Sequence, residues 1–305
     1  MASILQTAFE LGLISSLTVL ALFLSYSMLN VCDLSTDGCF TLGAAVGAIV
    51  ALAGHPFLSI PAAMGAGMIS GFITALLQTK MGIDSLLAGI IVNTGLYSIN
   101  IWVMGGASLL NMNKTGTVFT MAKELLHGTP LAGMYKMAVA LIAVVLVILF
   151  LTFFLRTRLG LAIRATGNNP DMVRSSSINP AFTTIVGLCI SNSFTALSGC
   201  LLAQSQKSVN IDIGSGIVTI SLASLLIGRA FAGKGSITLR AVGAVIGAVV
   251  FRLVYAAALR FHMPAFMLKL VSSAIVIIAI AGPYLKSRYP EFHRRMTHKY
   301  GKKVE

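Results

Sequence analysis

Residues 137–155 read MAVALIAVVLVILFLTFFL, a run of nineteen apolar or threonine residues bounded by Lys136 and Arg156. An α-helix rises about 1.5 Å per residue, so a run of this length reaches across a hydrocarbon core of about 30 Å. No charged side chain would have to enter lipid along it. The run therefore predicts a transmembrane helix.

Eight further apolar runs are candidates for membrane helices, at residues 11–31, 39–53, 57–78, 85–105, 181–205, 213–228, 240–259 and 266–285. The first lacks the positive leader and cleavage site of a signal peptide, so we expect a retained helix. The runs at 39–53 and 213–228 are short, which predicts tilted, re-entrant or broken helices buried in a bundle. We expect an all-α polytopic membrane protein of about eight or nine transmembrane or re-entrant helices, organised as a single transmembrane domain over residues 1–305.

The composition supports membrane embedding and argues against other classes of function. Only 10% of the residues are charged, against roughly 25% in soluble globular domains. The net charge of +13 would suit a nucleic-acid-binding protein, but the cations lie between apolar segments, so we expect no nucleic-acid partner. The four cysteines form no CxxC pair, and no catalytic constellation is visible. The sequence thus predicts neither a metal site nor a cofactor.

Most of the Lys and Arg residues gather in the loop at 156–180, the turn at 229–240 and the tail at 286–305. Pairs of crossings separate these segments, so all three lie on one side of the membrane. Positive charge accumulates on the cytoplasmic side. This places the C-terminus in the cytoplasm and, five crossings before Arg156, the N-terminus outside.

Glycine pairs at a spacing of four residues occur in three of the apolar runs. Such pairs let helix backbones approach closely in membranes. They are Gly43 with Gly47, Gly67 with Gly71, and Gly243 with Gly247. Together they predict a tightly packed bundle.

The loop at 156–182 reads RTRLGLAIRATGNNPDMVRSSSINPAF. Asn169 suits a helix N-cap, Pro170 the first helical position and Asp171 the positive helix end. Asn179-Pro180 biases the chain out of helical geometry soon afterwards. We expect a helix of about two turns between two membrane spans, either in an ordinary surface loop or as a docking element for a motor subunit.

The segment GLAIRATGNNPDMVRSSSINP resembles the coupling-helix loop of ABC importer permeases of the branched-chain amino acid and ribose type. Residues 33–43, DLSTDGCFTLG, resemble the family's early stretch at its second helix. Residues 214–247, GSGIVTISLASLLIGRAFAGKGSITLRAVGAVIG, resemble its late block of a small-residue helix, a Gly-rich turn and a Gly-rich helix. The similarity spans nearly the whole chain in the right order.

The resemblance implies the ABC importer permease fold and a complex in a bacterial plasma membrane. Its partners would be a second permease subunit, expected to form a homodimer, two cytoplasmic ABC ATPase subunits and an extracytoplasmic substrate-binding protein. The cytoplasmic coupling helix that docks on the ATPase would comprise Asn169, Pro170, Asp171, Met172, Val173, Arg174, Ser175, Ser176 and Ser177. The single-domain layout resembles members that accompany tryptophan- or aromatic-amino-acid-type binding proteins, with sugars or nucleosides as alternative substrates.

Residues Gly228–Gly235, GRAFAGKG, nearly spell a phosphate-binding P-loop. The last position of that motif is Ser or Thr, whereas this chain has Gly235, and both flanks read as membrane helices instead of a strand. A tight cytoplasmic turn explains the segment better. The energy for transport must therefore come from a partner protein.

Arg252 lies in the middle of the run at 240–259. A charge at that depth normally faces the bundle interior or a water-filled cavity. It either attracts a substrate carboxylate, or pairs with Asp33 or Asp37, or reaches toward the outer interface.

Uncharged polar residues within the apolar runs either join helices to one another or line a polar path. Asn93 and Asn100 share one helix face because they are seven residues apart. Asp33 either caps a half-helix or lines the pathway. The candidate pathway residues are Asp33, Ser35, Asn93, Ser98, Asn100, Asn192 and Arg252.

A secondary transporter that needs no ATPase is the competing class of function. It predicts intramembrane carboxylates for ion coupling, but Asp33, Asp37 and Asp84 all lie at span edges.

Overall fold

The computed structural model describes residues 2–125, 133–233 and 235–260, together with residues 270, 273–277 and 281. Most of the predicted span at 266–285 and the whole tail at 286–305 lie outside the described residues. Lys234, in the turn at 229–240, also lies outside them.

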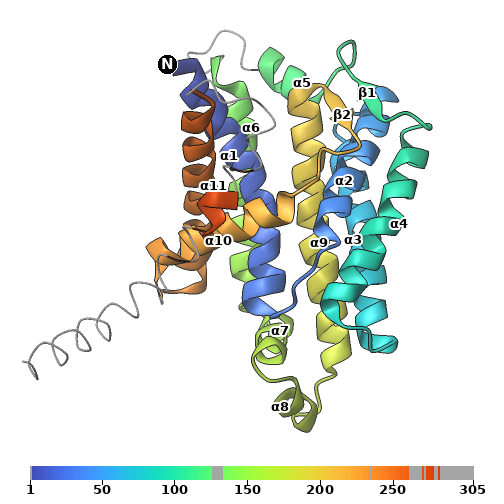
Figure 1. Cartoon of the computed structure of the whole chain (residues 1–305), viewed down its shortest axis with the longest axis vertical. Helices are drawn as coiled ribbons and strands as arrows, with labels where there is room; N and C mark the ends of the chain where they lie inside the picture. Colours follow the sequence, from blue (N-terminus) through green and yellow to red (C-terminus); the bar gives the residue numbers. More distant parts are fainter. Residues whose placement is uncertain are drawn as a thin grey trace, which may run out of the picture.

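Long apolar helices form the body of the molecule (Figure 1). Among the described residues, six helical segments are long and apolar enough to cross a membrane. They comprise α1 (Ala2–Leu22) with its π-helical continuation η1 (Phe23–Met28), α3 (Ser59–Lys80), α4 (Ser85–Val103), α6 (Tyr135–Phe154), α9 (Pro180–Gln206) and α11 (Ile237–Arg260). The predicted all-α membrane architecture is confirmed, and the quoted run at 137–155 is α6.

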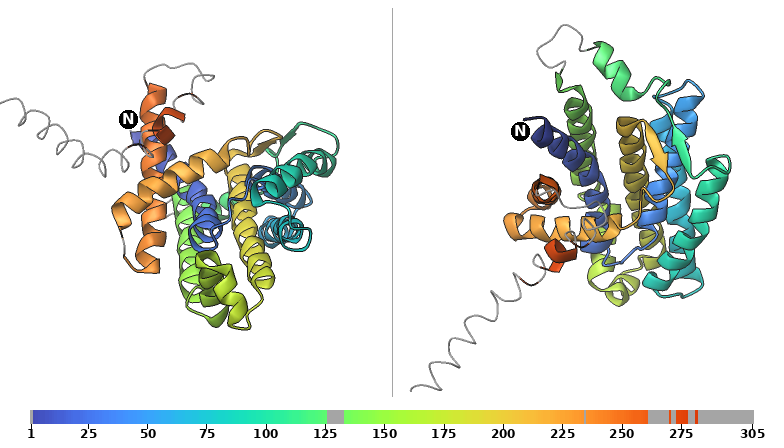
Figure 2. Two further views of the ribbon diagram at one scale, coloured as in Figure 1. Left: turned by 60° about the horizontal axis from the view of Figure 1, so that its bottom comes forward. Right: turned by 45° about the horizontal axis from the view of Figure 1, so that its top comes forward.

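Two further apolar helices are shorter, α2 (Thr36–Leu52) and α10 (Ile217–Ala232). They correspond to the runs at 39–53 and 213–228, for which the sequence predicts tilted, re-entrant or broken helices. The chain before α2 is non-helical from residue 29 to residue 35, and a loop from 211 to 216 precedes α10. Figure 2 shows α10 lying obliquely across the bundle, next to α11. Within the described residues, eight apolar helices thus correspond to eight of the nine predicted runs.

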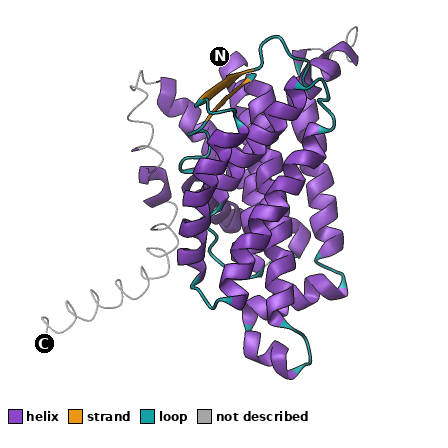
Figure 3. Ribbon diagram, turned by 90° about the vertical axis from the view of Figure 1, so that its right-hand side faces the viewer, coloured by secondary structure: helices purple, strands orange, loops and turns teal. Residues whose placement is uncertain are grey.

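The two ends of the bundle carry different small elements (Figure 3). One end has α5 (Val118–Leu125) and the antiparallel strands β1 (Leu109–Asn111) and β2 (Ser208–Asn210), in which Leu110 pairs with Val209. The other end has α7 (Arg158–Asn168) and α8 (Pro170–Ser175). The N-terminus lies at the strand end, opposite α8. An odd number of crossings places the two ends of a chain segment on opposite sides. The five crossings predicted before Arg156 therefore agree with this arrangement.

Helix α9 lies at the centre and is mostly buried, because α2 and α3 both pack against it. The predicted glycine pairs make these contacts. A Cβ on Gly43 would meet the backbone of Ala196, one on Gly67 the carbonyl of Asn192, and one on Gly71 the backbone of Leu188. The pair Gly243 and Gly247 packs in the same way against α10. The tightly packed bundle predicted from these pairs is confirmed.

Replacing Gly67 with Val should separate α3 from α9 and destabilise the bundle by ~1–3 kcal/mol, the usual range for overpacking. The apparent melting temperature of the purified protein in detergent measures this effect. Gly65→Val on the same helix is the control, because a Cβ at Gly65 meets open space. Equal losses of stability for the two variants would contradict the packing role of Gly67.

Candidate functional site

Asp33 fixes the start of the broken helix α2. Its carboxylate accepts a hydrogen bond from the backbone N–H of Ser35 at 2.8 Å, and a second from Nδ2 of Asn192 on α9 at 2.9 Å. The side chain is only 1% exposed and has no cationic partner among the described residues. Asp33 therefore ends the extended segment and ties it to α9.

Ser35 extends this contact to a third helix. Its hydroxyl accepts from Thr74 on α3 at 3.2 Å and from Asn192 at 3.4 Å. Asp33, Ser35 and Asn192 thus form one buried network between α2, α3 and α9. For these three pathway candidates, the structure places the side chains where they join helices.

Asp37 connects the two broken helices. It lies in the first turn of α2, and its carboxylate accepts from the backbone N–H of Gly216 at 2.9 Å and of Val218 at 2.8 Å. Those two groups belong to the N-terminus of α10, which is the positive end of that helix. One half-buried carboxylate therefore stands at the positive ends of two half-helices.

A polar pocket of about 440 Å³ opens beside Asp37. This volume is in the range of small-molecule sites. The pocket lies between α2, α4 and the loop before α10, and it is lined by Asp37, Gly38, Thr41, Asn93, Thr94, Tyr97, Ser98, Asn100, Ile211, Asp212 and Ser215. The pathway candidates Asn93, Ser98 and Asn100 are thus brought together, and Asp37 and Asp212 join them.

Asn100 offers an unused acceptor at this pocket. Its Nδ2 donates to the carbonyl of Gly38 at 3.1 Å, whereas its buried Oδ1 has no hydrogen-bond partner among the described residues. A buried polar atom without a partner is costly. A ligand that donates a hydrogen bond would relieve this cost.

Arg252 lies apart from this pocket, on the face of α11 that packs against α1. Its Nε donates to the hydroxyl of Ser15 at 3.4 Å, and its Cβ lies near Gly12. The pairing with Asp33 or Asp37 that the sequence left open is absent, because those carboxylates bind Asn192 and the start of α10.

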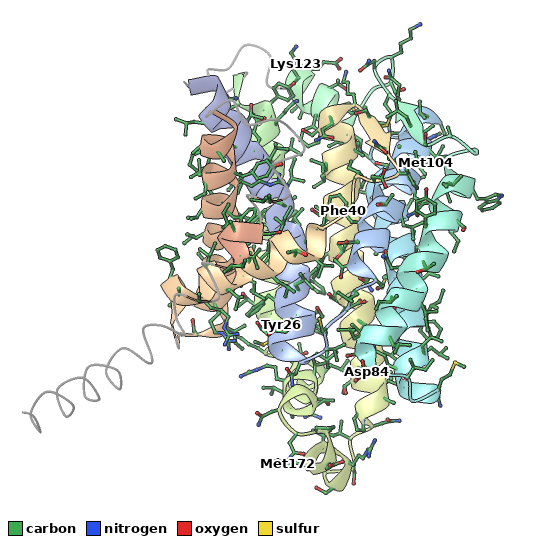
Figure 4. All side chains as sticks on the ribbon, viewed as in Figure 1. Tyr26, Phe40, Asp84, Met104, Lys123 and Met172 are labelled. Carbon is green, nitrogen blue, oxygen red and sulfur yellow. The ribbon has the colours of Figure 1, made fainter. Side chains whose placement is uncertain are left out.

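The predicted capped helix in the loop at 156–182 is present as α8, whose tip is labelled at Met172 in Figure 4. Asn169 caps it by accepting from the backbone N–H of Asp171 and of Met172, and Pro170 occupies the first turn. Met172 is 64% exposed, while Val173 is buried against the rest of the loop. Most of the predicted coupling residues thus face outward at the end of the molecule.

The sequence interpretation missed α7, the helix that carries α8. Thr157 caps α7, and the buried residues Gly160, Ile163 and Thr166 repeat at helical spacing, which is the signal that was available. Thr166 and Thr183 of α9 are hydrogen-bonded through their hydroxyls at 2.8 Å.

The other side of α7 packs against the end of η1. A Cβ on Gly167 would meet the carbonyl of Met28. Helix α7 therefore links α8 to α9 and also to the segment that leads into α2.

Comparison with known proteins places these features in a family. The chain matches the family described as "Branched-chain amino acid transport system / permease component" over residues 4–280. It is 29% identical over 295 residues to the tyrosine transport system permease protein of Clostridioides difficile, which covers 96% of each chain.

Two further relatives match a smaller share of this chain. An uncharacterised protein of Rickettsia prowazekii is 32% identical, covering 74% of this chain and 77% of the relative. The galactose/methyl galactoside import permease MglC of Escherichia coli is 27% identical, covering 74% of this chain and 66% of the relative. No solved structure matches.

The match over most of the chain, the multi-pass helical fold and the capped loop helix agree with one another. This chain belongs to the branched-chain amino acid permease family and is a multi-pass membrane permease of the ABC importer class for small solutes.

Proposed function

We propose that this chain forms the translocation pathway of an ATP-driven importer for an amino acid with a hydrophobic or aromatic side chain. The observation that carries the proposal is the pocket beside Asp37, where two broken helices meet. Broken helices with their ends at mid-membrane are a recurrent way to build a transport site. The pathway would run through this pocket, past Asn93, Ser98 and Asn100.

The chemistry of the pocket favours an amino acid. Asp37 and Asp212 contribute carboxylates and Asn100 contributes an unpaired acceptor, and no Lys or Arg of the described part of the chain lines the pocket. Such a lining suits the ammonium group of an amino acid, and Tyr97 offers an aromatic face to its side chain. The relative named as a tyrosine transport permease supports the same class of substrate. The galactose permeases keep a sugar as the alternative.

Helix α8 would be the element on which a separate ATPase acts. It is exposed, capped and held on α7, which contacts both α9 and η1. A push on α8 would therefore reach the extended segment between η1 and α2, next to Asp33. In this mechanism Asp33, Ser35 and Asn192 fix α2 to α9, so that a shift of α9 moves one wall of the pocket.

A second copy of the chain would complete the pathway. Thr94 and Ser98 are exposed on α4, and polar side chains are costly against lipid. The face that carries them is therefore expected to meet a partner or a water-filled path. A homodimer would place two such faces opposite each other.

In the plasma membrane, the end with α7 and α8 would face the cytoplasm and the ATPase. The end with α5, β1 and β2 would face the external binding protein. The C-terminal tail at 286–305 would be cytoplasmic, as the distribution of positive charge in the sequence predicts.

Uptake should require ATP and the ATPase. Proteoliposomes containing this permease, its partner ATPase and its binding protein are expected to accumulate labelled tyrosine or tryptophan only when ATP is present on the side of the ATPase. Uptake that persists without ATP, or with permease alone, would instead establish a secondary transporter. ATP-dependent uptake of galactose, but not of aromatic amino acids, would reassign the substrate.

Met172→Asp should weaken docking of the ATPase, because it places a charge at the exposed tip of α8. Co-purification of the ATPase with the permease measures this, and we expect a loss of roughly tenfold, as ~1.4 kcal/mol produces. Leu109→Asp is the control, since Leu109 is 61% exposed at the opposite end of the bundle. Normal co-purification of the Met172 variant would exclude α8 as the docking element.

Ser98→Phe should block uptake by filling the pocket beside Asp37. A ring placed there leaves little of the cavity free, and we expect a loss of roughly tenfold or more in the uptake rate. Ile99→Phe on the same helix is the matched control, because Ile99 is exposed and does not line the pocket. If both variants transport equally well, the pathway does not pass through this pocket.

A further inference from the structure

Arg164, Arg229 and Arg240 form an arginine cluster at the end of the bundle that carries α7 and α8. They come from α7, α10 and α11, and Arg240 lies near enough to the other two for their charges to repel. No carboxylate pairs with any of them among the described residues, where the one ion pair joins Arg174 to Asp171. Arginines that repel one another, with no counter-charge among the described residues, indicate a binding place for an anion.

A polar pocket of about 640 Å³ lies at this cluster. It is lined by the end of η1 and the following turn, by one side of α7, and by Arg240 at the start of α11. The lining residues are Ser27, Met28, Asn30, Leu161, Arg164, Ala165, Gly167, Asn168 and Arg240. Arg164 and Arg240 thus face one space from two different helices.

One neutral donor and a close contact between α7 and η1 complete this pocket. The hydroxyl of Ser27 is buried and has no hydrogen-bond partner among the described residues. The contact between Gly167 and the carbonyl of Met28 holds the floor in place. Arg240 also rests over the ring of Phe23, with its guanidinium carbon 5.6 Å from the ring centroid. That stacking positions the guanidinium group and leaves its hydrogen-bond donors free for a ligand.

We propose that this pocket binds the phosphate of an anionic phospholipid from the cytoplasmic leaflet, with Arg164 and Arg240 as its principal ligands. Guanidinium groups bind phosphate through paired hydrogen bonds. Arg229 adds long-range attraction at the rim, and Ser27 adds a neutral donor. The assignment to the cytoplasmic leaflet rests on the orientation given in the proposed function.

The surroundings of the pocket favour a lipid over a soluble phosphate. Leu161 lines the pocket and is 51% exposed, while Phe231 at the end of α10 and Leu239 at the start of α11 are also exposed. Apolar side chains beside a phosphate-binding group suit acyl chains. Basic clusters next to the cytoplasmic ends of membrane helices attract anionic lipids in this way.

Binding of an anionic lipid in this pocket would affect transport as well as hold the lipid on the protein. The lipid phosphate would bridge α7, which carries α8, to α11, which packs on α10 and α1. It would also contact the end of η1, from which the chain continues to Asp33 and α2. An anionic lipid is therefore expected to set how readily a movement of α8 spreads into the bundle.

The test measures lipid retention by the purified full-length permease with native mass spectrometry, without ATP or transported substrate. Phosphatidylglycerol is compared with phosphatidylcholine of the same acyl chains. Wild type should retain phosphatidylglycerol preferentially, and Arg164→Gln/Arg240→Gln should lose that preference by about 30-fold, as expected for two basic residues at a membrane surface. Lys114→Gln/Lys123→Gln removes the same charge from exposed positions at the opposite end and should retain it.

The other outcomes overturn the proposal in separate ways. Equal lipid preference in wild type and the arginine variant would exclude the pocket as a lipid site. Displacement of the lipid by inorganic phosphate alone would make it a site for a free anion. If the arginine variant keeps its lipid preference but loses the ATPase during co-purification, the cluster binds acidic groups of that partner.

Melting temperature and gel-filtration profile verify that both double variants are folded. Because no arm measures uptake, failure here is distinguishable from failure of the proposed transport function.

Discussion

The close approach of α2 and α3 to α9 is the contact on which the rest of the structure depends. Glycines at the crossing points let backbones touch, as where Gly43 meets Ala196 and Gly67 meets Asn192. Only at this separation can Asn192 reach both Asp33 and Ser35. Those hydrogen bonds give partners to the polar groups at the start of α2, which lies inside the bundle. A non-helical segment at membrane depth is tolerated only where protein buries it in this way.

The broken helices in turn create the pocket. A continuous helix exposes no free N–H groups along its length, whereas a helix that begins inside the bundle offers several. At α10 these groups bind Asp37, and the same carboxylate lies in the first turn of α2. Its negative charge is therefore held by two helix ends and needs no cationic side chain. This leaves the pocket rich in acceptors, which is the property that favours a substrate carrying an ammonium group.

Much of the fold could be predicted from the sequence because its causes are local. Uncharged runs predict the membrane helices, glycine pairs predict their close packing, and Asn169-Pro170 predicts the capped α8. Contacts between residues far apart in the sequence could not be predicted in this way. Asp37 and Gly216 are 179 positions apart, and no local pattern joins them. Helix α7 was not predicted, because its two arginines and two glycines disguise a buried face that only packing against α9 and η1 reveals.

The same distinction separates the polar candidates. Asn93 and Asn100 are seven residues apart on α4, so their spacing predicts one shared face, and both line the pocket together with Ser98. Arg252 looks equally unusual in the sequence, yet it packs on α1, where its long side chain reaches the hydroxyl of Ser15. A charge within an apolar run therefore identifies a buried face, but only the neighbouring helix determines whether that face lines a pathway. Here the polar pocket lies where two half-helices begin, because the backbone N–H groups at the start of α10 bind Asp37 and keep this acceptor beside the others.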